Sequence, residues 1–200
     1  MRLFIDVPVS GDYVRIMRRI QDTWRPRLAS RVSWTRPELA HVTLRFLGEV
    51  DKDRVPAIGD AMRAAVGKGF VAQGGSGGVF PRSGAPRVVW IDLAQGSSQC
   101  REICTRLDPA LVRFGFAPES RPFVAHVTMA RVKVAAGRDD WPGLLRDLGG
   151  VWPQWTVDRI VLWQSVLAAS GPRYTIVDEV MLGDGDHGRK IGIDSEIAFP

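Results

Sequence analysis

Two of the three histidines in this 200-residue chain stand in the same short frame, Ala-His-Val-Thr. The first copy holds His41 and Thr43, and the second holds His126 and Thr128. Two imidazoles can supply a general base and a general acid near neutral pH, because the ordinary pKa of histidine is about 6.5. A threonine hydroxyl can donate a hydrogen bond to an oxyanion. The four side chains therefore predict a catalytic site that cleaves a phosphate ester without a metal.

Both copies of the frame lie in runs of β-branched and apolar residues, which are typical of strands. Side chains two residues apart on a strand leave the same face. His41 and Thr43 are therefore expected to point one way, and Val42 and Leu44 into a core; the second copy repeats this split. A single frame would be better explained as a structural histidine, but the duplication favours a functional pair.

The rest of the pattern predicts strands and helices in two similar halves. Strands are expected over 2–9, 40–47, 87–93, 123–132, 155–163 and 173–182, with two more on either side of a flexible glycine-rich join at 74–78. Helices are expected over 11–24, 52–67, 98–114 and 139–148. This order indicates an α+β fold of two lobes, whose antiparallel sheets face a central cleft with helices on the outside. Residues 1–182 are expected to form one bilobal domain, and 183–200 a polar tail.

Composition and charge add weaker constraints. A hydrophobic content of 45% and a charged content of 24% are ordinary for a soluble globular chain. The net charge of +5, carried mostly by arginine, is compatible with an anionic substrate such as RNA. Cys100 and Cys104 lack the further ligands that zinc needs, so we expect neither a metal nor a cofactor. The absence of a leader or a membrane-spanning run predicts a cytoplasmic protein that binds no membrane.

The paired frames and their surroundings resemble the two-histidine (2H) phosphoesterase superfamily, and within it the RNA 2′,3′-cyclic phosphodiesterases, once called 2′-5′ RNA ligases. The resemblance covers residues 2–182. It includes the run Leu-Arg-Phe-Leu-Gly-Glu-Val at 44–50, Phe-Pro at 80–81, Arg-Pro-Phe at 121–123, and Tyr174 near the end. The family fold is bilobal, with pseudo-twofold symmetry and an active site in the central cleft.

The resemblance implies hydrolysis of RNA that ends in a 2′,3′-cyclic phosphate, with a 2′-phosphate as product and no metal or cofactor. It makes His126 the base and His41 the acid, although the two frames alone leave this assignment open. Arg131 and Phe46 are the implied substrate-binding residues. Strand alternation puts Arg131 on the opposite face from His126 unless a bulge intervenes, so a surface arginine is the alternative. Phe46 could stack a base or pack in the core.

Three other functions fit the same residues. The enzyme could act on another cyclic phosphate, such as that of ADP-ribose, or it could join RNA ends through a 2′-5′ bond. A protein that only binds nucleotides or RNA would not need both proton-transfer groups, so the intact pair of histidines argues against it. We expect a monomer.

Overall fold

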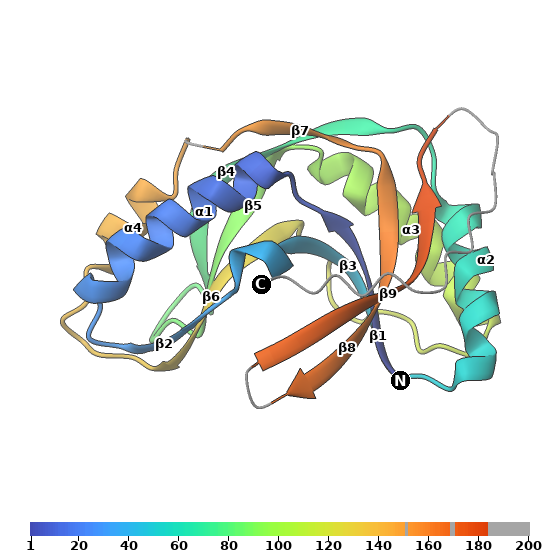
Figure 1. The fold of residues 1–200 in the computed structure, drawn as a ribbon, viewed down its shortest axis with the longest axis horizontal. Coiled ribbons are helices and arrows are strands. Elements are labelled where there is room, and N and C mark those ends of the chain that lie inside the picture. Colours follow the sequence, from blue (N-terminus) through green and yellow to red (C-terminus); the bar gives the residue numbers. More distant parts are fainter. Residues whose placement is uncertain (151, 169–170, 184–200) are drawn as a thin grey trace.

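The structure is a computed structural model that describes residues 1–150, 152–168 and 171–183. Four α-helices and nine strands make up the fold of this part of the chain (Figure 1). The helices are α1 (Gly11–Trp24), α2 (Val55–Ala65), α3 (Ser97–Arg113) and α4 (Trp141–Asp147). The strands are β1 (Arg2–Pro8), β2 (Arg31–Trp34), β3 (His41–Glu49), β4 (Phe70–Phe80), β5 (Val88–Gln95), β6 (His126–Val134), β7 (Gln154–Val157), β8 (Arg159–Ala168) and β9 (Gly171–Met181).

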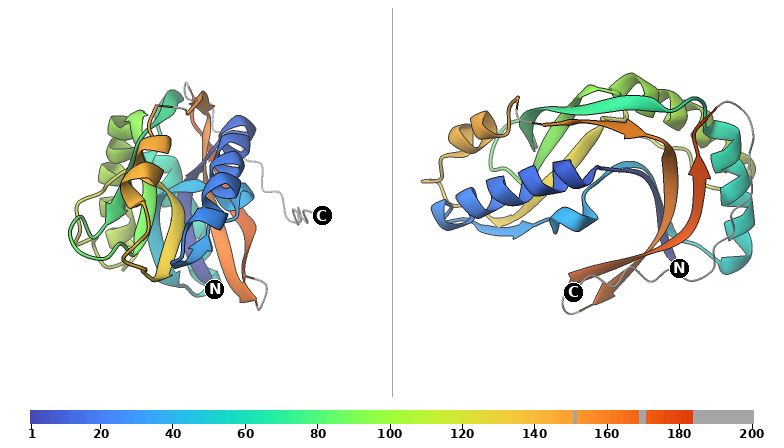
Figure 2. Two further views of the ribbon diagram at one scale, coloured as in Figure 1. Left: turned by 90° about the vertical axis from the view of Figure 1, so that its left-hand side faces the viewer. Right: turned by 45° about the horizontal axis from the view of Figure 1, so that its top comes forward.

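The strands form one antiparallel sheet in the order β7-β4-β5-β6-β3-β1-β8-β9, with β2 beside β6. The sheet curls strongly, and β8 and β9 extend from it as a long hairpin (Figures 1 and 2). The two strands that carry the His-Val-Thr frames, β3 and β6, are neighbours at its centre. The expected α+β fold is confirmed, and the sheets of the two halves are joined into one at this central pair.

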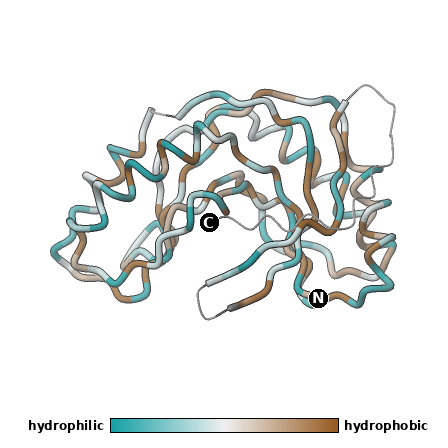
Figure 3. The backbone as a smooth tube through the Cα atoms, viewed as in Figure 1, coloured by the Kyte–Doolittle hydropathy of each residue, from teal (hydrophilic) through white to brown (hydrophobic). Residues whose placement is uncertain are grey.

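Helices flank the curled sheet on its outside (Figure 2). α1 begins after Ser10, whose hydroxyl accepts a hydrogen bond from the Tyr13 backbone N–H. It buries Tyr13, Met17 and Ile20 at helical spacing, and the Tyr13 ring stacks on Trp152 at 4.3 Å between centroids. α3 does the same with Ile103, Leu107 and others. Along the backbone, apolar stretches alternate with polar ones, as expected for elements with one buried side (Figure 3).

The glycine-rich segment at 74–78 is not the flexible join that was expected, because it lies inside the single strand β4. Its glycines are needed for close packing. A Cβ at Gly74 would lie 2.6 Å from the Trp152 side chain, and one at Gly78 would overlap the Trp90 ring. The irregular pairing of β4 with β5 around Gly74 and Gly77 bends the strand at this point.

Two strand predictions were incomplete. The strand expected over 155–163 is two strands separated at Asp158, because β7 pairs with β4 in one half while β8 pairs with β1 in the other. The short strand β2 was not expected; it pairs with β6 at the edge of the second frame.

Nothing in the structure tests the predicted domain limits, so the single domain over 1–182 stays a prediction. Residues 184–200 of the expected tail lie outside the described residues. Within the described ranges, each helix is too short or too polar to span a bilayer.

Candidate active site

The two frames meet across the centre of the sheet. Val42 of β3 is paired with Val127 of β6, and both valines are fully buried. Because the two strands are antiparallel, one step along each strand from this pair places His41 across from Thr128, and one step the other way places Thr43 across from His126. All four of these side chains are partly exposed, on the face opposite the buried valines. The structure therefore brings together the two histidines and two threonines, with an approximate twofold axis between them.

Each histidine is held by the same local hydrogen bond. Nδ1 of His41 lies 2.8 Å from the Leu39 carbonyl oxygen, and Nδ1 of His126 lies 2.8 Å from the Val124 carbonyl oxygen. A carbonyl oxygen can only accept, so Nδ1 carries the hydrogen in both rings. Nε2 is then the nitrogen left for chemistry: a neutral ring offers its lone pair there, and a protonated ring offers an N–H.

The environment of His41 favours its neutral form. Burial is the main reason that the pKa of His41 is lowered to about 4; the Leu39 carbonyl opposes this effect, and a nearby charge on His126 adds to it. The side chain is 17% exposed. The influence of one imidazole on the other is further evidence that the two rings share one site.

Aromatic rings surround His41. The Phe4 ring lies 5.0 Å from it and the Tyr174 ring 5.9 Å, measured between centroids. Tyr174 comes from β9, and burial followed by the negative charge of Asp6 raises the pKa of its hydroxyl. Strand pairing brings Phe4, His41 and Tyr174 together from distant parts of the chain, so their spacing in the sequence could not predict this contact. The only indication in the sequence was that Tyr174 belongs to the pattern shared with the family.

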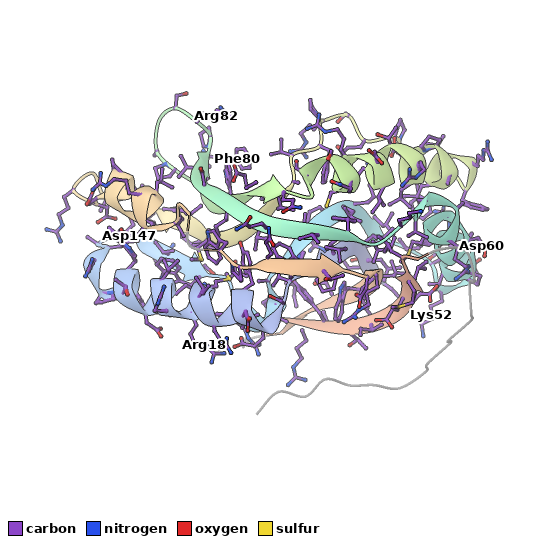
Figure 4. All side chains as sticks on the ribbon, turned by 90° about the horizontal axis from the view of Figure 1, so that it is seen from above. Arg18, Lys52, Asp60, Phe80, Arg82 and Asp147 are labelled. Carbon is purple, nitrogen blue, oxygen red and sulfur yellow. The ribbon has the colours of Figure 1, made fainter. Side chains whose placement is uncertain are left out.

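The surroundings of His126 are also aromatic but come from different elements. The Phe80 ring, at the end of β4, lies 5.6 Å from the imidazole, edge to face, and the Trp90 ring of β5 lies 6.2 Å away. Figure 4 shows Phe80 at the base of the loop that carries Arg82. This loop lies on the His126 side of the site, so its residues are candidates to meet the substrate.

A β-bulge follows each frame and decides where the next side chains point. On β6, Thr128 is paired with Trp90 of β5, but Ala130 is paired with the adjacent Val89, so β6 has one extra residue. The alternation is reset, and Arg131 returns to the face of the histidine. The side chain of Arg131 is exposed, and its guanidinium has no hydrogen-bond or ion-pair partner in the part of the chain that the structure describes.

β3 carries the same bulge. Thr43 is paired with Asp6 of β1, and Arg45 with the adjacent Ile5. Phe46 therefore lies on the face of its own histidine, where its ring is 6.0 Å from Phe4 and 61% exposed. A side chain so exposed does not pack in the core, so that alternative for Phe46 is wrong. Phe46 occupies the position on β3 that Arg131 occupies on β6.

The two threonine hydroxyls are free to bind a ligand. Among the described residues, neither Thr43 nor Thr128 has a hydrogen-bond partner for its side chain. Each hydroxyl lies on the same strand face as the histidine two residues before it. The site thus has two hydroxyl donors and one guanidinium around two imidazoles, a set suited to a phosphate group.

The most unexpected residue near the site is Asp6. It is only 2% exposed, and its Oδ2 lies 3.7 Å from Nδ1 of His41. Burial raises the pKa of this carboxyl well above its ordinary range, an effect that Trp163 and Arg159 oppose. The sequence carried one signal that was not used: an acidic residue in the middle of an otherwise apolar strand.

Among the described residues, no three His, Cys, Asp or Glu side chains lie together in a group that could hold a metal ion. Cys100 and Cys104 are buried or partly buried on α3. Burial raises the pKa of both thiols to about 12, so they are packing residues rather than reactive ones.

Comparison with known proteins agrees with this geometry. The family model of LigT-like phosphoesterases matches the chain twice, over residues 7–90 and 91–174, so each match contains one His-Val-Thr frame. An RNA 2′,3′-cyclic phosphodiesterase of Aeropyrum pernix is 37% identical over 70% of this chain and 80% of its own length. One of Thermotoga maritima is 29% identical over 92% of this chain and 97% of its own.

Solved structures show the same fold. TT0787 of Thermus thermophilus superimposes with a TM-score of 0.76 at 26% identity, over 92% of this chain and 100% of that one. E. coli LigT complexed with 3′-AMP gives a TM-score of 0.72 at 24% identity, over 90% and 97%. The chain therefore belongs to the LigT-like phosphoesterase family, and its expected place among the two-histidine phosphoesterases is confirmed.

Proposed function

We propose that this protein hydrolyses RNA ending in a 2′,3′-cyclic phosphate to a 2′-phosphomonoester, without a metal. The observation that carries the proposal is the pair of imidazoles, each with Nδ1 bound to a backbone carbonyl and Nε2 left free. Relatives over most of the chain length are named RNA 2′,3′-cyclic phosphodiesterases. Both findings point to one reaction class, in which one histidine removes a proton and the other delivers one.

The proposed reaction is an in-line displacement at phosphorus. Nε2 of His126 takes a proton from water, and the water oxygen forms a bond to phosphorus as the bond to the ribose O3′ breaks. Nε2–H of His41 gives its proton to O3′. The reaction consumes one water, leaves the phosphate on O2′, and ends with the proton on His126 instead of His41. Exchange with solvent resets the pair.

The remaining residues stabilise the charge that grows on the phosphate. Thr43 and Thr128 donate their free hydroxyls to the non-bridging oxygens, and the Arg131 guanidinium pairs with the same group. Phe46, exposed on the same face, offers a ring on which a base can stack. The bulges support these roles, because they return the Arg131 and Phe46 side chains to the strand face that carries the histidines.

The site also bears on assembly and location. One chain supplies both histidines and both threonines, so a second copy is not needed, and we propose a monomer. We propose a cytoplasmic location, because an RNA end is the substrate. We also propose that residues 1–182 act as one domain, since the sheet runs unbroken through both halves.

Phosphorus NMR of the reaction with adenosine 2′,3′-cyclic phosphate and with a short RNA bearing that end tests the proposal. We expect conversion to the 2′-phosphate. ADP-ribose cyclic phosphate should be the poorer substrate. A 3′-phosphate product would mean that the ribose binds the other way round, and no turnover of either RNA-like substrate would refute the proposed function.

A further inference from the structure

The two halves of the site differ at one equivalent position. Asp6 of β1 is paired with Thr43, and Trp90 of β5 is paired with Thr128. Because β1 flanks β3 as β5 flanks β6, these two residues occupy corresponding places beside the two frames. His41 therefore has a carboxyl group in ion-pair range, whereas His126 has an indole beside it and its cross-strand partner Asp92 is not in that range. The Asp6 and Trp90 side chains are almost fully buried.

The carboxyl of Asp6 is not explained by folding. It lies among apolar residues of β1, and its Oδ1 has no hydrogen-bond partner in the described part of the chain. Burying such a group without full hydrogen bonding destabilises the folded state. The nearest opposite partner is Nδ1 of His41, at 3.7 Å from Oδ2. Among the described residues, Asp6 is the one acidic side chain in ion-pair range of either catalytic histidine.

We propose that Asp6 is a positioning residue that makes His41 the acid of the pair, because its carboxylate beside Nδ1 stabilises the imidazolium of His41 when the substrate binds. This inference rests on the proposed function. The corresponding indole of Trp90 cannot stabilise a full positive charge in the same way, so His126 is left as the base. The structure thus breaks the near-equivalence of the two frames.

The protons balance within the pair. Burial disfavours charge on both groups, because it raises the pKa of the Asp6 carboxyl and lowers that of His41, and so it favours a protonated carboxyl beside a neutral imidazole. The anionic phosphate then places a negative charge beside Nε2 of His41. That charge favours gain of a proton by His41 at Nε2. The imidazolium that forms stabilises the Asp6 carboxylate beside it, so Asp6 releases its proton to solvent as His41 gains one. The pair still holds one proton, now where the leaving oxygen needs it.

Other charged and titratable groups around the pair act on the same equilibrium. Each comes from a strand packed against it: Arg2 of β1, His126 and Arg131 of β6, Arg159 of β8 and Tyr174 of β9. Arg159 favours the carboxylate form of Asp6, and His126 disfavours the imidazolium of His41. Arg2 and Arg131 act on the hydroxyl of Tyr174, which lies beside the pair. The pH profile of a variant at Asp6 must therefore be compared with that of a control variant in which Asp6 and all of these groups are unchanged.

The test is the pH dependence of kcat and KM on adenosine 2′,3′-cyclic phosphate for the wild type, Asp6→Asn and Asp6→Ala. The acid must be protonated, so its pKa in the complex sets the high-pH limb of kcat. A charge within about 4 Å shifts a pKa by about one to three units. In both variants we expect that limb to move to lower pH by that amount. At a pH above the limb, kcat should fall by about ten- to a thousandfold, with KM little changed.

Asp60→Asn is the matched control, because it removes the same charge from an exposed position on α2 (Figure 4). Its profile should follow the wild type. Thermal unfolding checks the fold: neither Asp6 variant should unfold at a lower temperature than the wild type, because the buried carboxyl is unfavourable. Failure of both variants to fold would show a structural role and overturn the inference.

The other outcomes separate the two hypotheses. A wild type without turnover refutes the proposed function and this inference with it. An active wild type whose high-pH limb is unchanged by Asp6→Asn overturns the inference alone. A shift of the low-pH limb instead would make His41 the base, which also overturns it.

Discussion

The lowered pKa of His41 can be tested without any substrate. Between about pH 6.5 and pH 4, an unfolded chain binds a proton on this histidine and the folded protein does not. The free energy of unfolding should therefore fall as the pH drops through this window, and stop falling below about pH 4. A shift from about 6.5 to about 4 corresponds to a loss of about 3 kcal/mol from this one group. The side chain is only 17% exposed, so solvent screening removes little of this effect.

The measurement is urea unfolding at a series of pH values from 7 to 4 for the wild type and His41→Gln. The difference between the two proteins isolates the histidine, because other titrating groups are present in both. This matters for Asp6, whose raised pKa acts in the opposite direction: its contribution is present at low pH and is lost as the pH rises. We expect the wild type to lose about 3 kcal/mol relative to His41→Gln across the window.

His126→Gln makes the same substitution on the other frame and serves as the control. NMR of the imidazole resonances gives a second readout, with the His41 signal identified by its loss in His41→Gln. A signal that titrates near pH 6.5, or a difference in unfolding free energy that stays flat from pH 7 to 4, would refute the reasoning from burial.

Three further predictions concern activity on adenosine 2′,3′-cyclic phosphate. His41→Ala and His126→Ala should each lower kcat about a hundred- to ten-thousandfold. Because both groups act in one step, the double variant should lose far less activity than the product of the two single losses. Near-normal turnover in a single variant would remove that histidine from the mechanism. Activity should survive EDTA, since no cluster of metal ligands occurs among the described residues; loss that a divalent ion restores would contradict this. Arg131→Ala should lower kcat/KM about ten- to a hundredfold, because a charge-assisted hydrogen bond to the phosphate is lost. Lys133→Ala, on the same strand, is the control and should lower kcat/KM less. Equal losses would mean that Arg131 contributes only its positive charge and does not bind the phosphate directly.

Local patterns were enough to predict how the side chains of the two frames are arranged. The alternation in each frame correctly put histidine and threonine on one face, because a central strand with one buried face tolerates little ambiguity of register. The helix at 11–24 was also predicted to its ends, since Ser10 caps it and its apolar residues recur at helical spacing. These features depend on neighbours along the chain, which a single sequence displays.

The positions of Arg131 and Phe46 could not be predicted in the same way. Regular alternation sends both to the face opposite the histidines, and only the extra residue in each bulge returns them. A bulge depends on how one strand pairs with another, and the partners here are β5 and β1, which lie far away in the sequence. Its appearance at the same place in both halves shows that the halves share a backbone plan that their residue identities conceal.

The same limitation explains why the site looks symmetric in sequence and is not symmetric in space. The frames are nearly identical, so nothing in them distinguishes an acid from a base. The distinction comes from the strand on the outer side of each frame, which brings Asp6 to one histidine and Trp90 to the other. A carboxylate stabilises a neighbouring positive charge much more strongly than an indole does, and this difference can divide two equivalent imidazoles into two roles. In a duplicated fold, the residues that assign those roles are therefore to be sought in the cross-strand neighbours and not in the repeated motif.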